Sequence, residues 1–465
     1  MTTATEQRRW TTALASYGRP RVVAMLFLGF SAGLPFLLVF ATLSAWLAQS
    51  GISRTDIGML SWIGIMYSIK FFWAPVVDRL SLPFLTRVLG RRRSWMLLAQ
   101  SGIALGLYGL SLSNPATALW PIVAFALLVA FSSATQDIVV DAWRIESAEN
   151  ELQGTMAAAY QFGYRIALIV AGAGALVLAA EASWPVAYVA MAACAAIGLL
   201  TTAVISEPQQ RSSRDTAMRE ARVVEYLSRS AHLPEWRRNL VSWFIGAVVC
   251  PFVDFFARNG VRTGAAILLF IGIFRLTDIT MGVMANPFYL DIGYTLKQIA
   301  AVAKVYGVLM SMLGVFVGGI AVFRYGAMRV LIVSGVLVIV TNLAFAALAY
   351  LPQPGLGGLM LVISADNFSA GLAGTAFIAY LSSLTNTAYT ATQYALFSSL
   401  FTLPGKLLAG GSGWVVDSFG YPAFFLYTSA LGLPALLLLV FYLMRRLPAA
   451  NPADAQNAVP AKRPA

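Results

Sequence analysis

The chain has 465 residues, of which 59% are hydrophobic and only 11% are charged, and its formal net charge is +12. Its mean hydropathy is +0.73. Soluble domains carry roughly 25% charged residues, so this composition excludes a water-soluble globular fold. The apolar runs are about 20 residues long and do not alternate, which predicts membrane-spanning α-helices rather than strands.

Twelve apolar runs fit spanning helices, and they fall into two sets of six. The first set covers residues 22–48, 57–77, 94–113, 117–141, 154–179 and 184–204. The second covers residues 264–290, 297–323, 327–350, 357–384, 390–413 and 421–444. We therefore expect a six-helix half at 22–205 and another at 264–444, both in an all-α membrane protein.

The remaining segments are polar. We expect a cytoplasmic N-terminal segment at 1–21, a cytoplasmic linker at 206–263 and a disordered cytoplasmic tail at 445–465. The basic start and the long first run argue against a cleaved signal peptide. Residues 241–256 are apolar but short and contain Pro251 and Asp254, which favours an interfacial helix over a thirteenth span.

The basic residues orient the chain. With the N-terminus in the cytoplasm, 25 of the 32 Lys and Arg residues fall on the cytoplasmic side, and only Arg54 and Lys297 fall on the other. This asymmetry follows the positive-inside rule. It predicts a multi-pass protein of the bacterial inner membrane with both termini cytoplasmic, and it explains the net charge through anionic lipid, without nucleic acid.

The two sets of helices resemble weak copies of each other. Residues 49–57 and 291–299 precede the second and eighth spans with a similar pattern, and SWPVAY (183–188) matches GYPAFF (420–425) at a similar offset. Two parallel six-helix repeats around a midplane site are typical of the major-facilitator fold. We expect a monomer, the default for that architecture.

Charged residues inside the spans mark the candidate site, because a charge at a helix centre costs about 2.5–3.5 kcal/mol on insertion scales. Five are basic (Lys70, Arg165, Arg275, Lys304 and Lys406), and the deep acidic ones are Asp137, Asp278 and Asp366. The positive excess favours an anionic substrate.

The three deep carboxylates are the candidates for proton coupling, which needs a carboxylate that protonates in one state and pairs in another. We expect Asp137 to pair with Arg165, and Asp278 with Arg275. Simple structural pairs remain open, as does a pair between Asp366 and Lys304, and Lys70 could reach toward the cytoplasm.

Aromatic and amide side chains accompany these charges and suit sugar rings and peptide groups, although most aromatics in a span only pack. With the five cations, the candidate substrate-binding set includes Gly33, Trp62, Gln136, Tyr160, Gln161, Tyr164, Asn367 and Gln393.

The stretch between the second and third spans carries candidate gating residues. Asp78 and Arg79 are followed by Arg91, Arg92 and Arg93. A positive-inside anchor explains the arginines but not the aspartate, which favours a clamp between cytoplasmic helix ends. SSATQDIVVDAW (132–143) adds Asp141, and Arg144 follows it within pairing reach on one helical face.

Metal and cofactor chemistry finds no support in the sequence. The single His232 lies in a polar segment, and the two cysteines, Cys194 and Cys250, lie in apolar segments as expected for buried free thiols. We expect no cofactor and no bound metal.

Six segments resemble one known family, the AmpG muropeptide permeases. They are GFSAGLPFLLVFATLSAWL (29–47), KFFWAPVVDR (70–79), GRRRSW (90–95), SSATQDIVVDAWR (132–144), DNFSAGLAGTAFIAYL (366–381) and TATQYALFSSL (390–400). The family motif residues at these positions are Gly33, Gln136, Asp137, Asp141, Trp143, Asp366, Asn367 and Gln393.

The resemblance implies proton-driven import of anhydromuropeptides, which are GlcNAc–anhydroMurNAc units with or without peptide. Such import serves peptidoglycan recycling and, indirectly, β-lactamase induction. A related permease for another anionic solute, a non-transporting membrane sensor and an intramembrane enzyme remain alternatives. The absence of a HExxH or Ser–Lys motif argues against the enzyme.

Overall fold

The computed structural model describes residues 10–52, 56, 60–208, 234, 241, 245, 249–351, 355–409 and 411–443. Within them the chain is helical and has no strand, which confirms the all-α class. Nine helices of this described part are long and apolar enough to cross a membrane. The predicted tail, residues 1–9 of the N-terminal segment and most of the linker, including 242–244 and 246–248, lie outside these residues.

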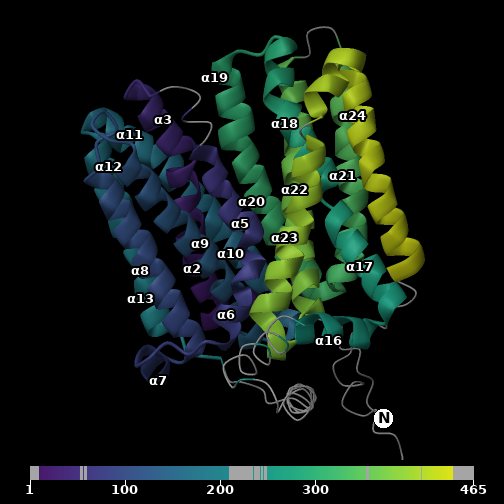
Figure 1. Ribbon diagram of the computed structural model, residues 1–465. Helices are drawn as coiled ribbons and strands as arrows, with labels where there is room; N and C mark the ends of the chain where they lie inside the picture. The colour runs from purple at the N-terminus through teal and green to yellow at the C-terminus, as the bar shows by residue number, and fades with distance from the viewer. Residues whose placement is uncertain are drawn as a thin grey trace, which may run out of the picture.

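The described residues of the N-terminal half form six successive helical segments, most of which run lengthwise through the molecule (Figure 1). A short lead of α1 (Trp10–Ala15) and η1 (Ser16–Gly18) precedes them. The segments are α2 (Pro20–Val39) with α3 (Ala41–Gln49), then η2 (Ser61–Gly64), α5 (Ile65–Ile69), η3 (Lys70–Phe72) and α6 (Ala74–Arg79), then α8 (Arg91–Ser111), α9 (Trp120–Ser147), α10 (Asn150–Ile169) with η4 (Val170–Gly174) and α11 (Ala175–Glu181), and α12 (Trp184–Cys194) with α13 (Ala196–Val204).

The C-terminal half has six segments of the same kind. They are α17 (Val261–Ile273) with α18 (Leu276–Asp291), α19 (Leu296–Ile299) with η6 (Ala300–Tyr306) and α20 (Gly307–Tyr325), α21 (Ala327–Tyr350), α22 (Leu356–Leu384), α23 (Thr390–Ala409), and α24 (Ser412–Leu438) with η8 (Leu439–Leu443). The short α7 (Leu85–Leu89) and α16 (Cys250–Asn259) lie at one end, which we call the linker side. There α16 runs across the helix ends rather than alongside them (Figure 1).

Two spanning segments are interrupted beside a cation. Ile69 has φ −101° and ψ 8°, immediately before Lys70. Arg275 has φ −100° and ψ 9°, between α17 and α18. These dihedrals lie outside the helical region. Broken helices are tolerated at membrane depth where the freed backbone faces protein or a cavity, so both breaks mark positions near a site.

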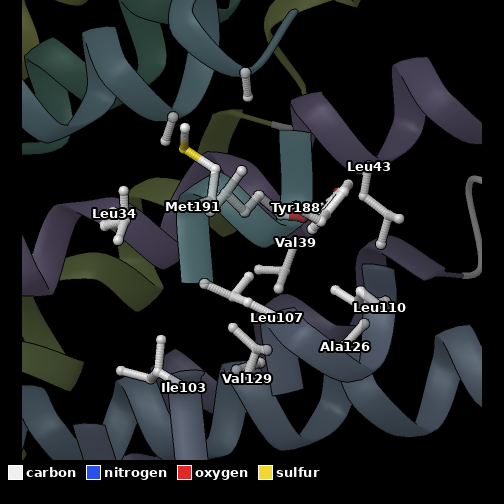
Figure 2. Packing of buried hydrophobic residues seen from close by; sticks show 14 of the residues in the cluster. Leu34, Val39, Leu43, Ile103, Leu107, Leu110, Ala126, Val129, Tyr188 and Met191 are labelled. Carbon is white, nitrogen blue, oxygen red and sulfur yellow. Dashed lines mark hydrogen bonds between the residues drawn. The ribbon is translucent and has the colours of Figure 1, made fainter. Parts of the chain in front are cut away.

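Each half has its own apolar core. In the N-terminal half, away from the linker side, α2, α8, α9 and α12 bury Leu34, Leu107, Val129 and Met191 against one another (Figure 2). The hydroxyl of Tyr188 in this core donates a 2.9 Å hydrogen bond to the Leu38 carbonyl. The buried phenol is therefore satisfied, as such groups are in most proteins.

Glycines let the helices of each half approach closely. A Cβ on Gly163 of α10 would lie 1.8 Å from the Leu26 carbonyl oxygen of α2, and one on Gly29 would lie 2.0 Å from that of Tyr160. In the other half, a Cβ on Gly314 would lie 2.1 Å from the Phe368 carbonyl oxygen. Small residues at such crossings replace the hydrophobic drive that lipid does not supply.

The two halves join through their cores near the linker side. Ala391 and Ala395 of α23 belong to a cluster built mainly from N-terminal-half residues such as Met25 and Trp143. Conversely, Ile145 of α9 belongs to the C-terminal-half cluster around Phe270 and Phe397. The polar groups described next lie along this junction.

Candidate functional site

Asp137 on α9 pairs with a lysine. Its Oδ2 lies 3.9 Å from Nζ of Lys70, and the two side chains are 18% and 9% exposed. The predicted partner, Arg165, was wrong, because the helix break at Ile69 brings Lys70 against α9 instead. Lys70 is buried and does not reach toward the surface. The second oxygen of Asp137 is buried without a hydrogen bond from the described residues.

Asp141 and Arg144, one turn toward the linker side, join the halves. Their Oδ1 and Nη2 are 3.0 Å apart, as the helical spacing predicts. Nη1 of Arg144 donates a 2.6 Å hydrogen bond to Oγ of Ser382 on α22. The same guanidinium lies 5.1 Å from the ring centroid of Tyr394 on α23. Arg144 is fully buried, so this cation connects α9 to two helices of the other half.

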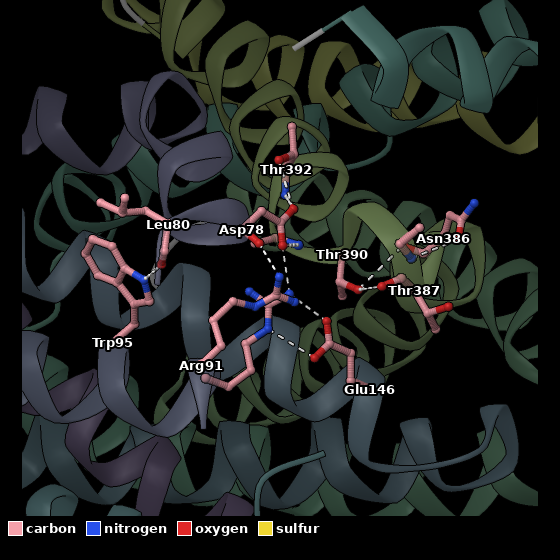
Figure 3. Close-up of polar contacts among 12 residues, drawn as sticks. Asp78, Leu80, Arg91, Trp95, Glu146, Asn386, Thr387, Thr390 and Thr392 are labelled. Carbon is pink, nitrogen blue, oxygen red and sulfur yellow. Dashed lines mark hydrogen bonds and ion pairs between the residues drawn. The ribbon is translucent and has the colours of Figure 1, made fainter. Parts of the chain in front are cut away.

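Asp78 forms a second connection at the linker side. Its Oδ1 lies 2.7 Å from Nη2 of Arg92, which also contacts Glu146 at 2.6 Å. Its Oδ2 accepts hydrogen bonds from N and Oγ1 of Thr392, each 2.9 Å long. Figure 3 shows Asp78 between Glu146 and Thr392. The aspartate therefore holds α23 to the start of α8, a geometry that fits the expected clamp; we call these four residues the Asp78 clamp.

Electrostatics strengthen the Asp78 clamp. Burial alone would raise the pKa of the Asp78 carboxyl, but the guanidiniums of Arg92 and Arg91, with the hydrogen bonds from Arg92 and Thr392, outweigh it and hold that pKa below its usual range. The carboxylate is consequently charged at neutral pH. Charge-assisted hydrogen bonds of this kind are roughly twice as strong as neutral ones.

Two of the other candidate gating arginines, Arg91 and Arg93, hold the same region together. Arg91 donates to the Asp78 carbonyl. Arg93 donates to the carbonyls of Thr202 (3.0 Å) and Ala203 (2.7 Å) at the end of α13. Arg79 is half-buried at the end of α6. The printed hydrogen bonds of Arg91 and Arg93 therefore tie linker-side ends of the N-terminal half to one another.

The middle of the molecule brings several predicted binding residues together. Tyr160 and Tyr164 of α10 are half-buried, with ring centroids 6.2 Å apart. Gln161 of α10 donates a 2.8 Å hydrogen bond from Nε2 to Oγ1 of Thr375 on α22. Arg165 follows these residues on the same helix, one turn beyond Gln161, which places aromatic, amide and cationic groups at the boundary between the halves.

A cation and two carboxylates lie on the C-terminal side of that boundary. Nε of Arg275 is 2.9 Å from Oδ2 of Asp278, which confirms the predicted pair. Asp366 on α22 lies within electrostatic range of both. Its neighbour Asn367 donates to the Ile363 carbonyl at 3.1 Å and packs near Gly307. The side chains of Lys304 and Lys406 lie outside the described residues, so a pair of Asp366 with Lys304 stays a prediction.

Three predicted binding residues occupy packing or docking positions instead. A Cβ on Gly33 would lie 2.7 Å from the Tyr164 carbonyl oxygen, so this glycine serves the α2–α10 crossing. Gln136 is fully buried and accepts a 2.8 Å hydrogen bond from Ser31. In this structure both residues face the inside of the N-terminal half, and their contact with substrate stays a prediction.

Gln393 is the third of these residues, and its role in substrate binding likewise stays a prediction. Its Nε2 donates to the Pro251 carbonyl at 2.8 Å and to Oδ2 of Asp254 at 2.9 Å. Its Oε1 accepts from the Asn386 backbone at 2.8 Å. Gln393 is therefore buried against α16 at the linker side. By contrast, Trp62 in η2 is 71% exposed.

Sequence reasoning missed the partners that α22 and α23 contribute to these contacts. Ser382 accepts a hydrogen bond from Arg144, and the Tyr394 ring lies beneath the same guanidinium. Thr392 donates a hydrogen bond to Asp78. Two of them flank Gln393 in the TATQYAL segment, which the family likeness had already singled out. Hydroxyl groups are too common in spanning helices to signal such a role by themselves.

Two six-helix halves joined around a buried polar layer define a transporter fold, and residues 25–409 match the Major Facilitator Superfamily. A structure titled as the proton:xylose symporter XylE bound to 6-bromo-6-deoxy-D-glucose superposes with a TM-score of 0.62 at 13% identity, covering 93% of this chain and 96% of that one. The human organic anion transporter MFSD10 gives 0.61 at 15% identity, covering 90% and 100%. At these identities the likeness concerns the fold alone.

The curated relatives are more specific. AmpG 4 of Rickettsia conorii is 35% identical over 423 residues, covering 90% of this chain and 96% of its own length. The anhydromuropeptide permease of Escherichia coli K12 is 31% identical over 429 residues, covering 92% and 80%. The chain therefore belongs to the AmpG family of membrane permeases within that superfamily.

Proposed function

We propose that this permease imports anhydromuropeptides, coupled to proton entry. The observation that carries the proposal is the 31% sequence identity between this chain and a protein named anhydromuropeptide permease, over most of both chains. The polar layer supports it, since Arg165 and Arg275 suit an anionic solute while Tyr160, Tyr164 and Gln161 suit sugar rings and amides. We propose peptidoglycan recycling as its role, with β-lactamase induction as an indirect consequence.

The orientation belongs to the same proposal. The linker side carries Arg79, Arg91, Arg92 and Arg93, so the positive-inside rule makes it the cytoplasmic face of an inner membrane. The Asp78 and Arg144 contacts between the halves then close the cytoplasmic end. In an alternating-access cycle a substrate would enter from the other face, and these contacts would break to release it.

Proton coupling is proposed to run through Asp137. In its charged form the carboxylate pairs with Lys70; a proton on Asp137 would remove that attraction and free the lysine. A proton that enters together with a singly charged anion carries no net charge across the membrane, so the pH gradient is the driving force. One pH unit supplies about 1.36 kcal/mol for each proton, which corresponds to about tenfold accumulation.

An uptake assay tests the proposal. We expect proteoliposomes to accumulate labelled GlcNAc–anhydroMurNAc when the outside is acidified, and a protonophore to abolish the accumulation. Accumulation that persists with the protonophore would overturn proton coupling. No uptake of this disaccharide, together with uptake of another carboxylate solute, would favour a related permease for that solute. No flux of any solute would favour a membrane sensor.

A further inference from the structure

We propose that Arg165 and Arg275 form a carboxylate-binding pair shared by the two halves, so that the carboxylate of the solute bridges them. The inference rests on the proposed function and names the group of the solute that the site recognises. For the anhydro-disaccharide that group is the lactyl carboxylate of the anhydroMurNAc unit.

Side chains from the two halves approach each other at Gly374 on α22. A Cβ there would lie 2.9 Å from Oε1 of Gln161 and 3.6 Å from Nη1 of Arg275. Gln161 is fixed in place by its hydrogen bond to Thr375. Arg165 follows Gln161 by four residues and so lies on the same face of α10. A face of one half and a guanidinium of the other therefore converge where α22 has no side chain to separate them.

The charges around the two arginines are unequal. Arg275 has carboxylates beside it on its own half, Asp278 at 2.9 Å and Asp366 within electrostatic range. Arg165 forms no ion pair with any carboxylate in the part of the chain that the structure describes, and the charged side chain that acts on it is Arg275, another cation. A partly buried cation without a counter-ion is costly, so Arg165 gains most from an incoming carboxylate.

Guanidinium chemistry identifies the ligand class. Arg presents a planar fork that matches the two oxygens of a carboxylate, whereas Lys provides only a point charge. Arg165 and Arg275 are both partly exposed, so a solute can reach them. A carboxylate between them would pair with Arg165 and compete with Asp278 for Arg275. The bound solute would thereby draw the two halves together.

Binding to purified permease in nanodiscs tests this. The probes are GlcNAc–anhydroMurNAc with a free lactyl carboxylate and its neutral methyl ester, titrated calorimetrically at pH 7. We expect the wild-type protein to bind the acid about tenfold or more tightly than the ester, the size of one charge-assisted contact. Arg165→Gln should abolish this preference by weakening the acid and leaving the ester unchanged. Arg165→Lys should recover part of it.

Controls separate the outcomes. Arg262→Gln, at an exposed arginine near the start of α17, should keep the wild-type preference, and Arg275→Gln should lose it if Arg165→Gln fails to fold. Equal wild-type affinity for acid and ester overturns the inference and leaves the proposed function standing. Equal losses for both ligands in Arg165→Gln overturn it too, in favour of a structural arginine. Wild-type protein that binds neither ligand overturns the proposed function itself.

Discussion

Nζ of Lys70 and Oδ2 of Asp137 are 3.9 Å apart between two helices of the same half. The pair joins α9 to the broken segment that ends in α6, so a change of charge on Asp137 alters contacts within the N-terminal half first. Arg144 and Asp78 then connect that half to α22 and α23. A carboxylate that gains and loses a proton at this position is well placed to bias contacts between the halves.

Asp137→Asn should abolish uptake driven by a pH gradient, because an amide cannot exchange a proton. The variant should also unfold at a lower temperature, since Lys70 then lacks its partner. Adding Lys70→Met should restore thermal stability without restoring uptake. Proteoliposome flux and thermal unfolding in detergent measure the two effects separately. Wild-type pH-dependent uptake by Asp137→Asn would exclude this residue from coupling.

Asp78→Asn should loosen the Asp78 clamp. The loss of charge weakens the bonds to Arg92 and Thr392, and a hydrogen bond to a charged group contributes about 2 kcal/mol. That shifts the balance between joined and separated halves roughly thirtyfold. Labelling of an engineered Ala391→Cys, buried in the wild type, should therefore accelerate. Asp291→Asn, an exposed carboxylate remote from the clamp, should leave the labelling rate unchanged.

The same clamp should resist mild acid. The pKa of Asp78 is lower in this structure than the ordinary value of about 3.9. A lowered pKa means that the stabilisation is fully present above the ordinary value and is lost as the pH falls through the lowered one. The Ala391→Cys labelling rate should therefore stay constant between pH 7.5 and pH 5.5, because even pH 5.5 is more than one unit above the ordinary aspartate pKa of about 3.9. Faster labelling at pH 5.5 would show that another group opens the clamp.

The sequence identified functional residues whose charge differs from that of their neighbours in the chain. It did not identify the distant residues that these charges contact. The role of Asp78 could be predicted because membrane anchoring explains the arginines around it but not an aspartate. Its acceptor contact with Thr392, 314 positions away, could not. Gln136 and Asp137 are neighbours in one motif, but successive residues of a helix are turned by about 100°. One therefore faces Ser31 inside the half while the other faces Lys70.

The pairing of Asp137 failed for a related reason. The break at Ile69 has no proline or glycine at it, so the sequence contains no signal that Lys70 would turn toward α9. The pair of Arg275 with Asp278 succeeded because three residues of spacing on a helix suffice to place it. Local geometry is readable from spacing, whereas contacts between distant helices depend on breaks and crossings that composition does not encode.

Gly163→Ala should destabilise the N-terminal half. The added Cβ would lie 1.8 Å from the Leu26 carbonyl oxygen, and backbone cannot move aside as a flexible side chain can. Forcing α2 and α10 apart should cost about 1–3 kcal/mol, as overpacking does. Gly282→Ala on α18, where nothing lies within 4 Å, is the matched control. Equal thermal unfolding of both variants in detergent would contradict the close crossing.

Gln393→Leu should release α16 from the end of α23. Gln393 bonds to Pro251 and Asp254 of α16, while its neighbour Thr392 bonds to Asp78 of the other half. One helix end thus holds both the linker helix and the clamp between the halves. Leucine keeps the volume of the side chain but removes its donors and acceptor, so α16 should detach more often. Trypsin cleavage after Arg258, at the end of α16, should accelerate severalfold.

The same variant should transport more slowly, because an α16 that no longer follows α23 cannot position the helix end that Thr392 presents to Asp78. Gln49→Leu is the control, since Gln49 accepts a 2.7 Å bond from Trp184 within the N-terminal half and contacts neither α16 nor the clamp. Faster cleavage with unchanged uptake would limit α16 to a tether. Unchanged cleavage would show that the contacts with Pro251 and Asp254 do not hold α16 in place.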